Sequence, residues 1–415
     1  MDYNMLHCII FISLLLVGNL LQGFPTAKRT NESFIDKKWV NNSHILPTES
    51  GKSQQKASMC RPTDKNPIPQ GTKIDKSPIS KDTKQPIDSH ILPTESGKSQ
   101  QRISICWPTA QSPISKDAKQ SIDSCIQATE SGKKESGTFG LVRQNGTKFH
   151  EGIDIKSFTK DKNGKPTDCI YAFMDGKVVY VNTSESASAY GRYVVLEHEY
   201  FLTLYAHLAS TSVSVGKTIK AGEKLGILGT SSNCAKIPDT RAHLHFEIDF
   251  QIDNGPNFST WYTKKYNSLP PHGAYNGYNL IGVDPLIIIE KLTKGTSFTN
   301  ILSDEKEAAT VQIAGNYIPP FVNKYAKLFA LSIDLSKPVH GWNIQFSWFG
   351  LPISWTPIYN KIEQAQKIKL VSYRKSLMEQ SIKTNILEKS SKGSNEITVG
   401  SKIVNNLNKM GFTTN

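Results

Sequence analysis

Short apolar runs separated by glycine and turn residues dominate the middle of the chain. They are rich in Val, Leu, Ile and Tyr, and Asp175-Gly176 is a turn signal between two of them. The runs cover 177–181, 193–197, 202–206, 213–216, 219–222 and 225–229. This pattern predicts a mainly β fold, with a compact antiparallel β-sheet domain over residues 138–290, and it leaves no room for a helix of ordinary length within this series.

The segment 241–248 alternates as a strand does. His243 and His245 fall on one face, while Leu244 and Phe246 fall on the other. A His-x-His pair arises easily by chance in a chain with ten histidines, so the motif alone is weak. Its position on an alternating strand strengthens it.

Both ends of the chain differ from this middle region. Residues 28–137 are polar, rich in Ser, Thr, Lys, Gln and Pro, and repetitive, since 43–52 returns as 89–98 and 77–82 as 112–117. We expect a disordered, low-complexity repeated tether, because the segment has too little apolar surface to offset chain entropy. A repeated wall- or partner-binding module is the alternative. Residues 291–415 are expected to form a small α/β or helical accessory region of unknown function, with helical composition over 358–388.

An apolar run at 6–17 suits a signal-peptide core better than a membrane span. Lys28 and Arg29 follow the run, and this charge order keeps an uncleaved membrane anchor over residues 1–27 open. We therefore expect an exported protein of the periplasm, cell envelope or extracellular space. Cys169 and Cys234 could pair in such a compartment, although two thiols are the simpler interpretation.

The formal net charge of +13 does not belong to the β region. Residues 138–290 carry 15 basic and 15 acidic side chains, so the excess lies in the flanks. A nucleic-acid enzyme would place a basic stripe on its working domain, and nucleic acid is therefore not expected as a partner. The basic flanks could instead hold the protein near anionic wall polymers or a membrane surface.

Five of the ten histidines lie between positions 150 and 245. His150 and Asp154 are too far apart in a straight strand to share an ion, and only a bend at Gly152 would bring them together. A catalytic zinc site needs three N or O ligands and a fourth open position, and His150, Asp154 and His245 can supply the three. His207 and His243 then remain for proton transfer and oxyanion stabilisation. Each residue alone also has a plain structural interpretation, as a surface or core histidine.

Taken together, these motifs resemble the M23 family of zinc metallopeptidases, the lysostaphin and LytM type of peptidoglycan endopeptidase. The resemblance runs over roughly 138–248 through five elements in the family's order, namely His150-Glu151-Gly152-Ile153-Asp154, Ala172 to Val178, Tyr190-Gly191, Tyr205-Ala206-His207-Leu208 and His243-Leu244-His245-Phe246-Glu247.

The resemblance implies one Zn²⁺ bound by His150, Asp154 and His245, with His207 and His243 as the catalytic pair. It further implies a zinc metalloendopeptidase that hydrolyses peptide bonds in the stems or cross-bridges of peptidoglycan. Two alternatives stay open: a non-catalytic protein of the same fold that activates another wall hydrolase, and an exported zinc protease that acts on a non-wall protein.

The chain departs from the family in a long loop at 230–241 and in an insertion between Ile252 and Asp284. Both are expected to border the narrow groove that the resemblance implies.

Overall fold

The computed structural model describes residues 88–92, 101–114, 121–130, 132–234, 236–329, 331, 333–334, 336–362, 367–390 and 396–414. The predicted leader or anchor at 1–27 and most of the predicted tether lie outside these residues. Among the described residues no helix is long and apolar enough to span a membrane.

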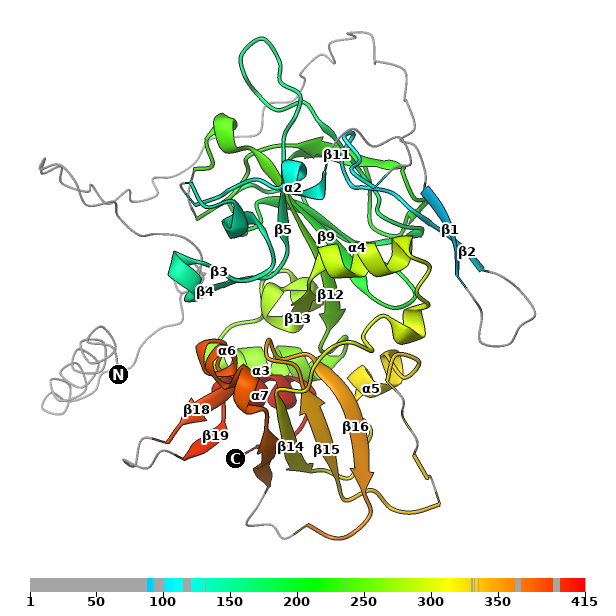
Figure 1. Cartoon of the computed structure of the whole chain (residues 1–415), viewed down its shortest axis with the longest axis vertical. Helices are drawn as coiled ribbons and strands as arrows, with labels where there is room; N and C mark the ends of the chain where they lie inside the picture. The colour runs from blue at the N-terminus through cyan, green and yellow to red at the C-terminus, as the bar shows by residue number, and fades with distance from the viewer. Residues whose placement is uncertain are drawn as a thin grey trace, which may run out of the picture. The chain divides into compact units, whose positions relative to one another are not determined.

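A large antiparallel sheet forms the middle of the chain, and it confirms the predicted mainly β fold (Figure 1). One path through it runs in the order β10-β7-β8-β9-β11-β6, and β12 adds to β9 and also pairs with β5 and β13. The strands are β5 (Ile153–Lys156), β6 (Cys169–Tyr171), β7 (Gly176–Asn182), β8 (Arg192–Glu197), β9 (Leu202–Thr211), β10 (Thr218–Ile219), β11 (Lys224–Leu228), β12 (His243–Gln251) and β13 (Leu280–Val283). A separate hairpin of β3 (Gly140–Arg143) and β4 (Lys148–His150) precedes β5.

Strand β12 carries the alternation that the sequence predicts. Leu244, Phe246 and Ile248 are fully buried in the main apolar core. His245 pairs with Asp154 of β5 on one side and with Ala206 of β9 on the other. The strand therefore holds its two histidines between the segments that carry the other candidate site residues.

Part of the segment assigned to the tether packs against this domain. Ile105, Trp107 and Ile126 are buried, and the Cys106 N–H donates to the Phe173 carbonyl at 2.8 Å. A hairpin of β1 (Asp88–Leu92) and β2 (Gln101–Ile105) and the short helix α2 (Ile122–Cys125) lie in the same segment. The buried apolar residues of the described part from 104 onward thus pack on the sheet and do not form a free tether, while the domain boundaries stay predictions.

Two helices lie outside the 177–229 series to which the expectation of no helix applied. Helix α3 (Pro256–Tyr266) lies in the insertion, and α4 (Pro285–Thr293) follows β13 with Asp284 as its N-cap. The Asp284 side chain accepts a hydrogen bond from the Leu286 N–H at 2.9 Å, and Pro285 occupies the first turn. Together these residues form an ordinary helix start.

The C-terminal region contains a four-stranded antiparallel sheet in the order β16-β15-β14-β17. Its elements are β14 (Ala309–Ala314), α5 (Pro320–Lys324), β15 (Gly341–Phe346), β16 (Pro352–Ile358), β17 (Ile368–Tyr373), α6 (Met378–Lys383), β18 (Leu387–Lys389), β19 (Ile397–Val399) and α7 (Ser401–Lys409). The helical expectation for 358–388 is wrong over β17, where Ile368 and Leu370 alternate with the exposed Lys369 and pair with β14.

Candidate metal centre

The bend expected at Gly152 brings His150 and Asp154 together. Strand β4 ends at His150, and β5 begins at Ile153. A Cβ on Gly152 would lie 2.3 Å from the Phe246 carbonyl oxygen, so only glycine fits this close approach to β12. The turn places the Nε2 atom of His150 3.3 Å from Oδ1 of Asp154.

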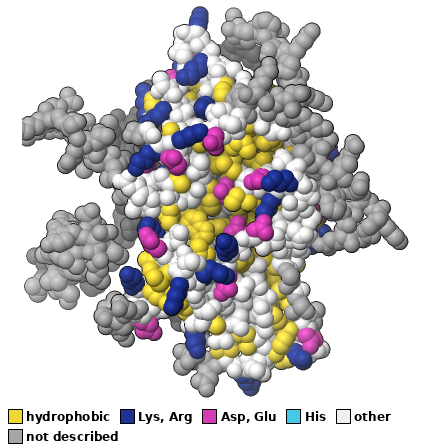
Figure 2. Space-filling model, viewed as in Figure 1, with side chains coloured by type: hydrophobic (Ala, Val, Ile, Leu, Met, Phe, Trp, Pro, Cys, Tyr) yellow, Lys and Arg dark blue, Asp and Glu magenta, His cyan; other side chains and the backbone are white. Residues whose placement is uncertain are grey.

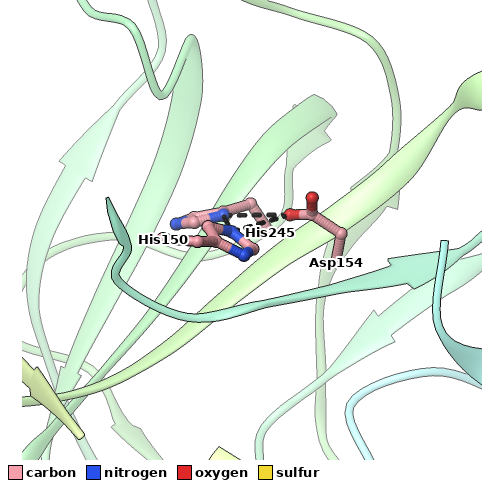
Figure 3. Close-up of side chains that lie close together, drawn as sticks. All are labelled: His150, Asp154 and His245. Atoms are coloured by element: carbon pink, nitrogen blue, oxygen red, sulfur yellow. Dashed lines mark hydrogen bonds and ion pairs between the residues drawn. The ribbon is translucent and has the colours of Figure 1, made fainter. Parts of the chain in front are cut away.

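His150, Asp154 and His245 point toward one another and form the group that could hold a metal ion (Figure 3). The Nδ1 atom of His245 lies 3.0 Å from Nε2 of His150 and 3.1 Å from Oδ1 of Asp154. Ligands at about 2.0–2.2 Å from a tetrahedral zinc ion are about 3.3 Å apart, so the three donor atoms have the spacing that such an ion requires. All three residues are buried, which keeps competing water away.

Each histidine ligand candidate is oriented by a hydrogen bond from its other ring nitrogen. Nδ1 of His150 donates to the Thr138 carbonyl at 2.7 Å, and Nε2 of His245 donates to Oε1 of Glu247 at 2.5 Å. These bonds orient the rings so that Nε2 of His150 and Nδ1 of His245 face the centre. Burial lowers the pKa of His245, but Glu247 and Asp154 outweigh it and raise the pKa to about 9, so a metal ion that binds Nδ1 displaces a proton from this ring.

The charges favour an ionised aspartate at the centre. Burial raises the pKa of Asp154, but His150, His243 and Arg143 together outweigh it and hold the pKa well below its usual range. Burial lowers the pKa of His150 to about 4, so this imidazole is neutral at neutral pH. A carboxylate and a neutral imidazole are the forms in which these side chains bind a metal.

His207 and His243 lie beside this group. Their ring centroids are 5.0 Å apart, and the His207 ring is 5.9 Å from that of His245. Nδ1 of His207 donates to the Ser231 carbonyl at 2.8 Å, and Nδ1 of His243 donates to the Arg241 carbonyl at 2.8 Å. Burial lowers the pKa of both rings. Each therefore presents a neutral Nε2 that can accept a proton.

The backbone at His207 is in the left-handed region, with φ of 62°. Histidine adopts this conformation rarely, and strain of this kind persists where the surrounding structure fixes it, commonly at functional sites. The His207 N–H donates to the Tyr190 carbonyl at 2.9 Å, which helps to hold the turn.

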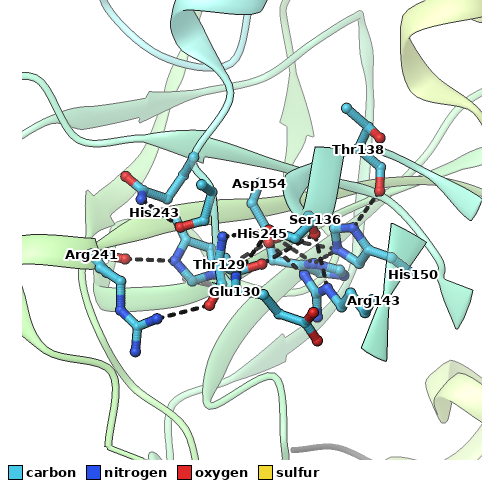
Figure 4. A network of polar contacts seen from close by, with 12 residues as sticks. Thr129, Glu130, Ser136, Thr138, Arg143, His150, Asp154, Arg241, His243 and His245 are labelled. Carbon is cyan, nitrogen blue, oxygen red and sulfur yellow. Dashed lines mark hydrogen bonds and ion pairs between the residues drawn. The ribbon is translucent and has the colours of Figure 1, made fainter. Parts of the chain in front are cut away.

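Sequence reasoning gave no role to Arg143, which lies at the centre of the polar network in Figure 4. Its guanidinium contacts Oδ2 of Asp154 at 2.5 Å and donates from Nε to the Ser136 carbonyl at 3.0 Å. The residue is buried, and its guanidinium binds Oδ2 of Asp154, the carboxylate oxygen that does not face His150 and His245. An isolated Arg before the His150 motif gave no usable signal, because its contact forms only when β3 folds back along β4.

Tyr205 and His198, two other residues of the β domain, make structural hydrogen bonds. The Tyr205 hydroxyl accepts the Phe173 N–H at 2.8 Å inside the core, and the side chain is fully buried. Tyr205 therefore contributes to packing. His198 bonds to the Asp175 carbonyl and to Thr203.

Residues 148–258 match Peptidase family M23. The chain thus carries a Peptidase family M23 domain, and all five predicted site residues fall within it.

Several curated bacterial proteins are similar over the same region. The uncharacterized lipoprotein YgeR of Escherichia coli K12 is 35% identical over 25% of this chain and 35% of its own length. The peptidoglycan DD-endopeptidase ShyB of Vibrio cholerae is 33% identical over 26% and 21%, and the murein hydrolase activator NlpD of E. coli K12 is 30% identical over 28% and 25%. The chain thus spans little more than a third of the length of these relatives at most.

Among solved structures, the catalytic domain of lysostaphin from Staphylococcus simulans is 27% identical, with 27% of this chain and 74% of that chain covered and a TM-score of 0.20. A zinc-containing peptidase from Vibrio cholerae is 33% identical over 24% and 26%, with a TM-score of 0.19.

Proposed function

We propose that the chain is a zinc metalloendopeptidase that hydrolyses peptide bonds in the stems or cross-bridges of bacterial peptidoglycan. The observation that carries this proposal is the convergence of Nε2 of His150, Oδ1 of Asp154 and Nδ1 of His245 within 3.0–3.3 Å of one another. Similarity to a peptidoglycan DD-endopeptidase supports the choice of substrate.

His150, Asp154 and His245 would hold one Zn²⁺, which supplies Lewis acidity toward the scissile carbonyl and toward water. Arg143 keeps the second oxygen of Asp154 occupied, so that the first remains directed at the ion. Glu247 and the Thr138 carbonyl hold the two imidazole rings in their tautomers. The protein thus contributes a preorganised set of three ligands.

His207 and His243 are the proposed proton-transfer residues. Nε2 of one ring accepts a proton from the attacking water, while Nδ1 stays bonded to a backbone carbonyl. Once protonated, that Nε2–H can donate to the developing oxyanion or to the leaving amine. Both Nδ1 bonds prevent the rings from turning away.

A regulatory role is the second candidate, because NlpD, named as a murein hydrolase activator, is among the similar proteins. This chain has every side chain that hydrolysis needs, and we therefore propose catalysis ahead of activation. Action on a non-wall protein would use the same residues and is distinguished only by substrate. We further propose export to the cell envelope, with the basic flanks near anionic polymers or membrane.

The decisive variant is His243→Ala, which removes a proposed proton-transfer group and keeps all three proposed ligands. We expect unchanged zinc content and loss of at least a hundredfold in the rate at which purified sacculi lose turbidity. His340→Ala, in the C-terminal region, is the matched control and should retain full activity.

Retained hydrolysis by His243→Ala would contradict the assignment of this pair. A parent protein that binds zinc, leaves sacculi intact and increases the activity of an added wall hydrolase would support the regulatory alternative.

A further inference from the structure

The insertion folds back across the sheet face that carries His245. Residues 268–279, here called the roof segment, join α3 to β13. Nε2 of His272 donates to the Ala187 carbonyl at 2.9 Å, and Nδ1 accepts from the Tyr180 hydroxyl at 2.8 Å. The Tyr275 ring stacks on Tyr180 with centroids 5.4 Å apart. His272 therefore ties the roof segment to β7 and to the loop that follows it.

The roof segment closes the face of β12 beyond the metal centre. Glu247, Asp249 and Gln251 share this face with His245 and are as buried as it is, and Nε2 of Gln251 donates to the Ala274 carbonyl of the roof segment at 3.0 Å. The Tyr190 hydroxyl donates to Glu247 at 3.0 Å, and Gly277 of the roof segment packs so tightly on Tyr190 that a Cβ would lie 3.1 Å from its oxygen.

Glu247 lies two residues beyond His245. Because an extended chain rises about 3.3 Å per residue, the closed end is about two residues from the metal centre.

An open cavity of about 340 Å³ lies at the 230–241 loop that precedes β12. Its lining includes Glu185, Ser232, Asn233, Lys236, Ile237 and Asp239. The neighbouring Ser231 carbonyl accepts the Nδ1 bond of His207, and Asp239 begins the short turn that ends just before His243. The loop that lines the cavity thus also holds Nδ1 of His207 at Ser231 and leads into His243.

We propose that the roof segment makes the binding groove one-ended and so sets the substrate class. An extended peptide enters from the cavity side, and about two residues fit on the roof side of the scissile bond. The substrates are then peptides with a free end close to that bond, whereas a peptide continued at both ends is excluded. This inference rests on the proposed peptidase function.

The test uses three synthetic peptides based on a stem sequence that the parent protein cleaves: unextended, extended by Gly-Gly-Gly at the amino end, and extended likewise at the carboxyl end. Three residues reach about 10 Å, past the closed end. We expect one extension to lower kcat/KM at least tenfold and the other to change it less than twofold. His272→Ala should restore cleavage of the disfavoured peptide and leave the unextended one within twofold.

Leu269→Ala is the matched control, because Leu269 belongs to the same segment but is 77% exposed; it should discriminate as the parent does. Tyr180→Phe removes the hydrogen bond between Tyr180 and His272 by deleting its donor. It should restore cleavage of the disfavoured peptide in the same way, and it replaces His272→Ala if that variant does not fold. Equal cleavage of all three peptides by the parent, or unchanged discrimination in the loosened variants, would overturn the roof proposal alone. A parent that cleaves no peptide would instead contradict the proposed function.

Discussion

Arg143 supports the metal centre without being one of its proposed ligands. Its buried guanidinium contacts the carboxylate oxygen of Asp154 that faces away from the histidines. Removing one partner of a buried pair leaves the other charge without compensation. The ion pair therefore both orients the carboxylate and stabilises it in the apolar interior.

We predict that Arg143→Ala lowers zinc affinity about 10- to 100-fold and lowers the free energy of unfolding of the metal-free chain by about 3 kcal/mol. Arg143→Lys should recover only part of both, because an ammonium cannot bond Asp154 and the Ser136 carbonyl with one planar group. Zinc titration and urea unfolding measure the two effects. The exposed Arg374→Ala serves as control, and equal zinc affinity in Arg143→Ala and Arg374→Ala would refute the role.

At the level of single elements, the turn between β4 and β5 decides whether the ligands meet. A Cβ at position 152 would lie 2.3 Å from the Phe246 oxygen and 2.8 Å from Cγ of Glu247. The β4–β5 turn would have to move away from β12, and with it His150 and Asp154 from His245.

Gly152→Ala should therefore lower the free energy of unfolding by about 1–3 kcal/mol and weaken zinc binding as well. Gly255→Ala is a suitable control, since its Cβ would meet only the Asp253 carboxylate at 3.6 Å. Thermal unfolding with and without zinc checks both parts. A variant that is less stable yet binds zinc normally would show that the turn does not set the ligand geometry.

Elements differ in how far the sequence predicts them. The central strands follow from local alternation, and the need for a bend at Gly152 follows from the distance between His150 and Asp154. Helix α4 was not predicted, although Asp284 followed by Pro285 is an ordinary helix start. Contacts such as Arg143 with Asp154 and His272 with Tyr180 join distant segments, and no local pattern encodes them.

At the scale of the whole molecule, helix α7 links the C-terminal region to the insertion. Nζ of Lys409 donates to the Tyr278 carbonyl at 2.6 Å and lies 4.7 Å from the Trp261 ring centroid. Burial, together with the Lys402 and Lys265 charges, lowers the pKa of Lys409 to about 7 from 10.5. The folded chain thus holds this proton less tightly than the unfolded chain does.

Between pH 7 and 10.5 the unfolded chain binds more protons at Lys409, so the unfolding free energy rises with pH, by at most about 1.4 kcal/mol per pH unit. Lys409→Met removes this contribution. We expect the stability of the parent relative to Lys409→Met to increase by about 2 kcal/mol from pH 7 to 9 in urea unfolding. An identical difference at both pH values would contradict a depressed lysine pKa.

The net charge of +13 belongs to the flanks of the chain, because the β domain that carries the site is neutral. On the face shown in Figure 2, basic and acidic side chains are interspersed around an apolar patch, with no stripe of one sign.

The central claim is peptide-bond hydrolysis at the His150, Asp154 and His245 centre, and it is tested most directly by digesting purified peptidoglycan in ¹⁸O-labelled water. Mass spectrometry of the released fragments should show new peptide carboxylates with one ¹⁸O each for the zinc-loaded parent, and none for His243→Ala. Fragments with intact peptide bonds, or equal ¹⁸O incorporation by the parent and His243→Ala, would contradict the account.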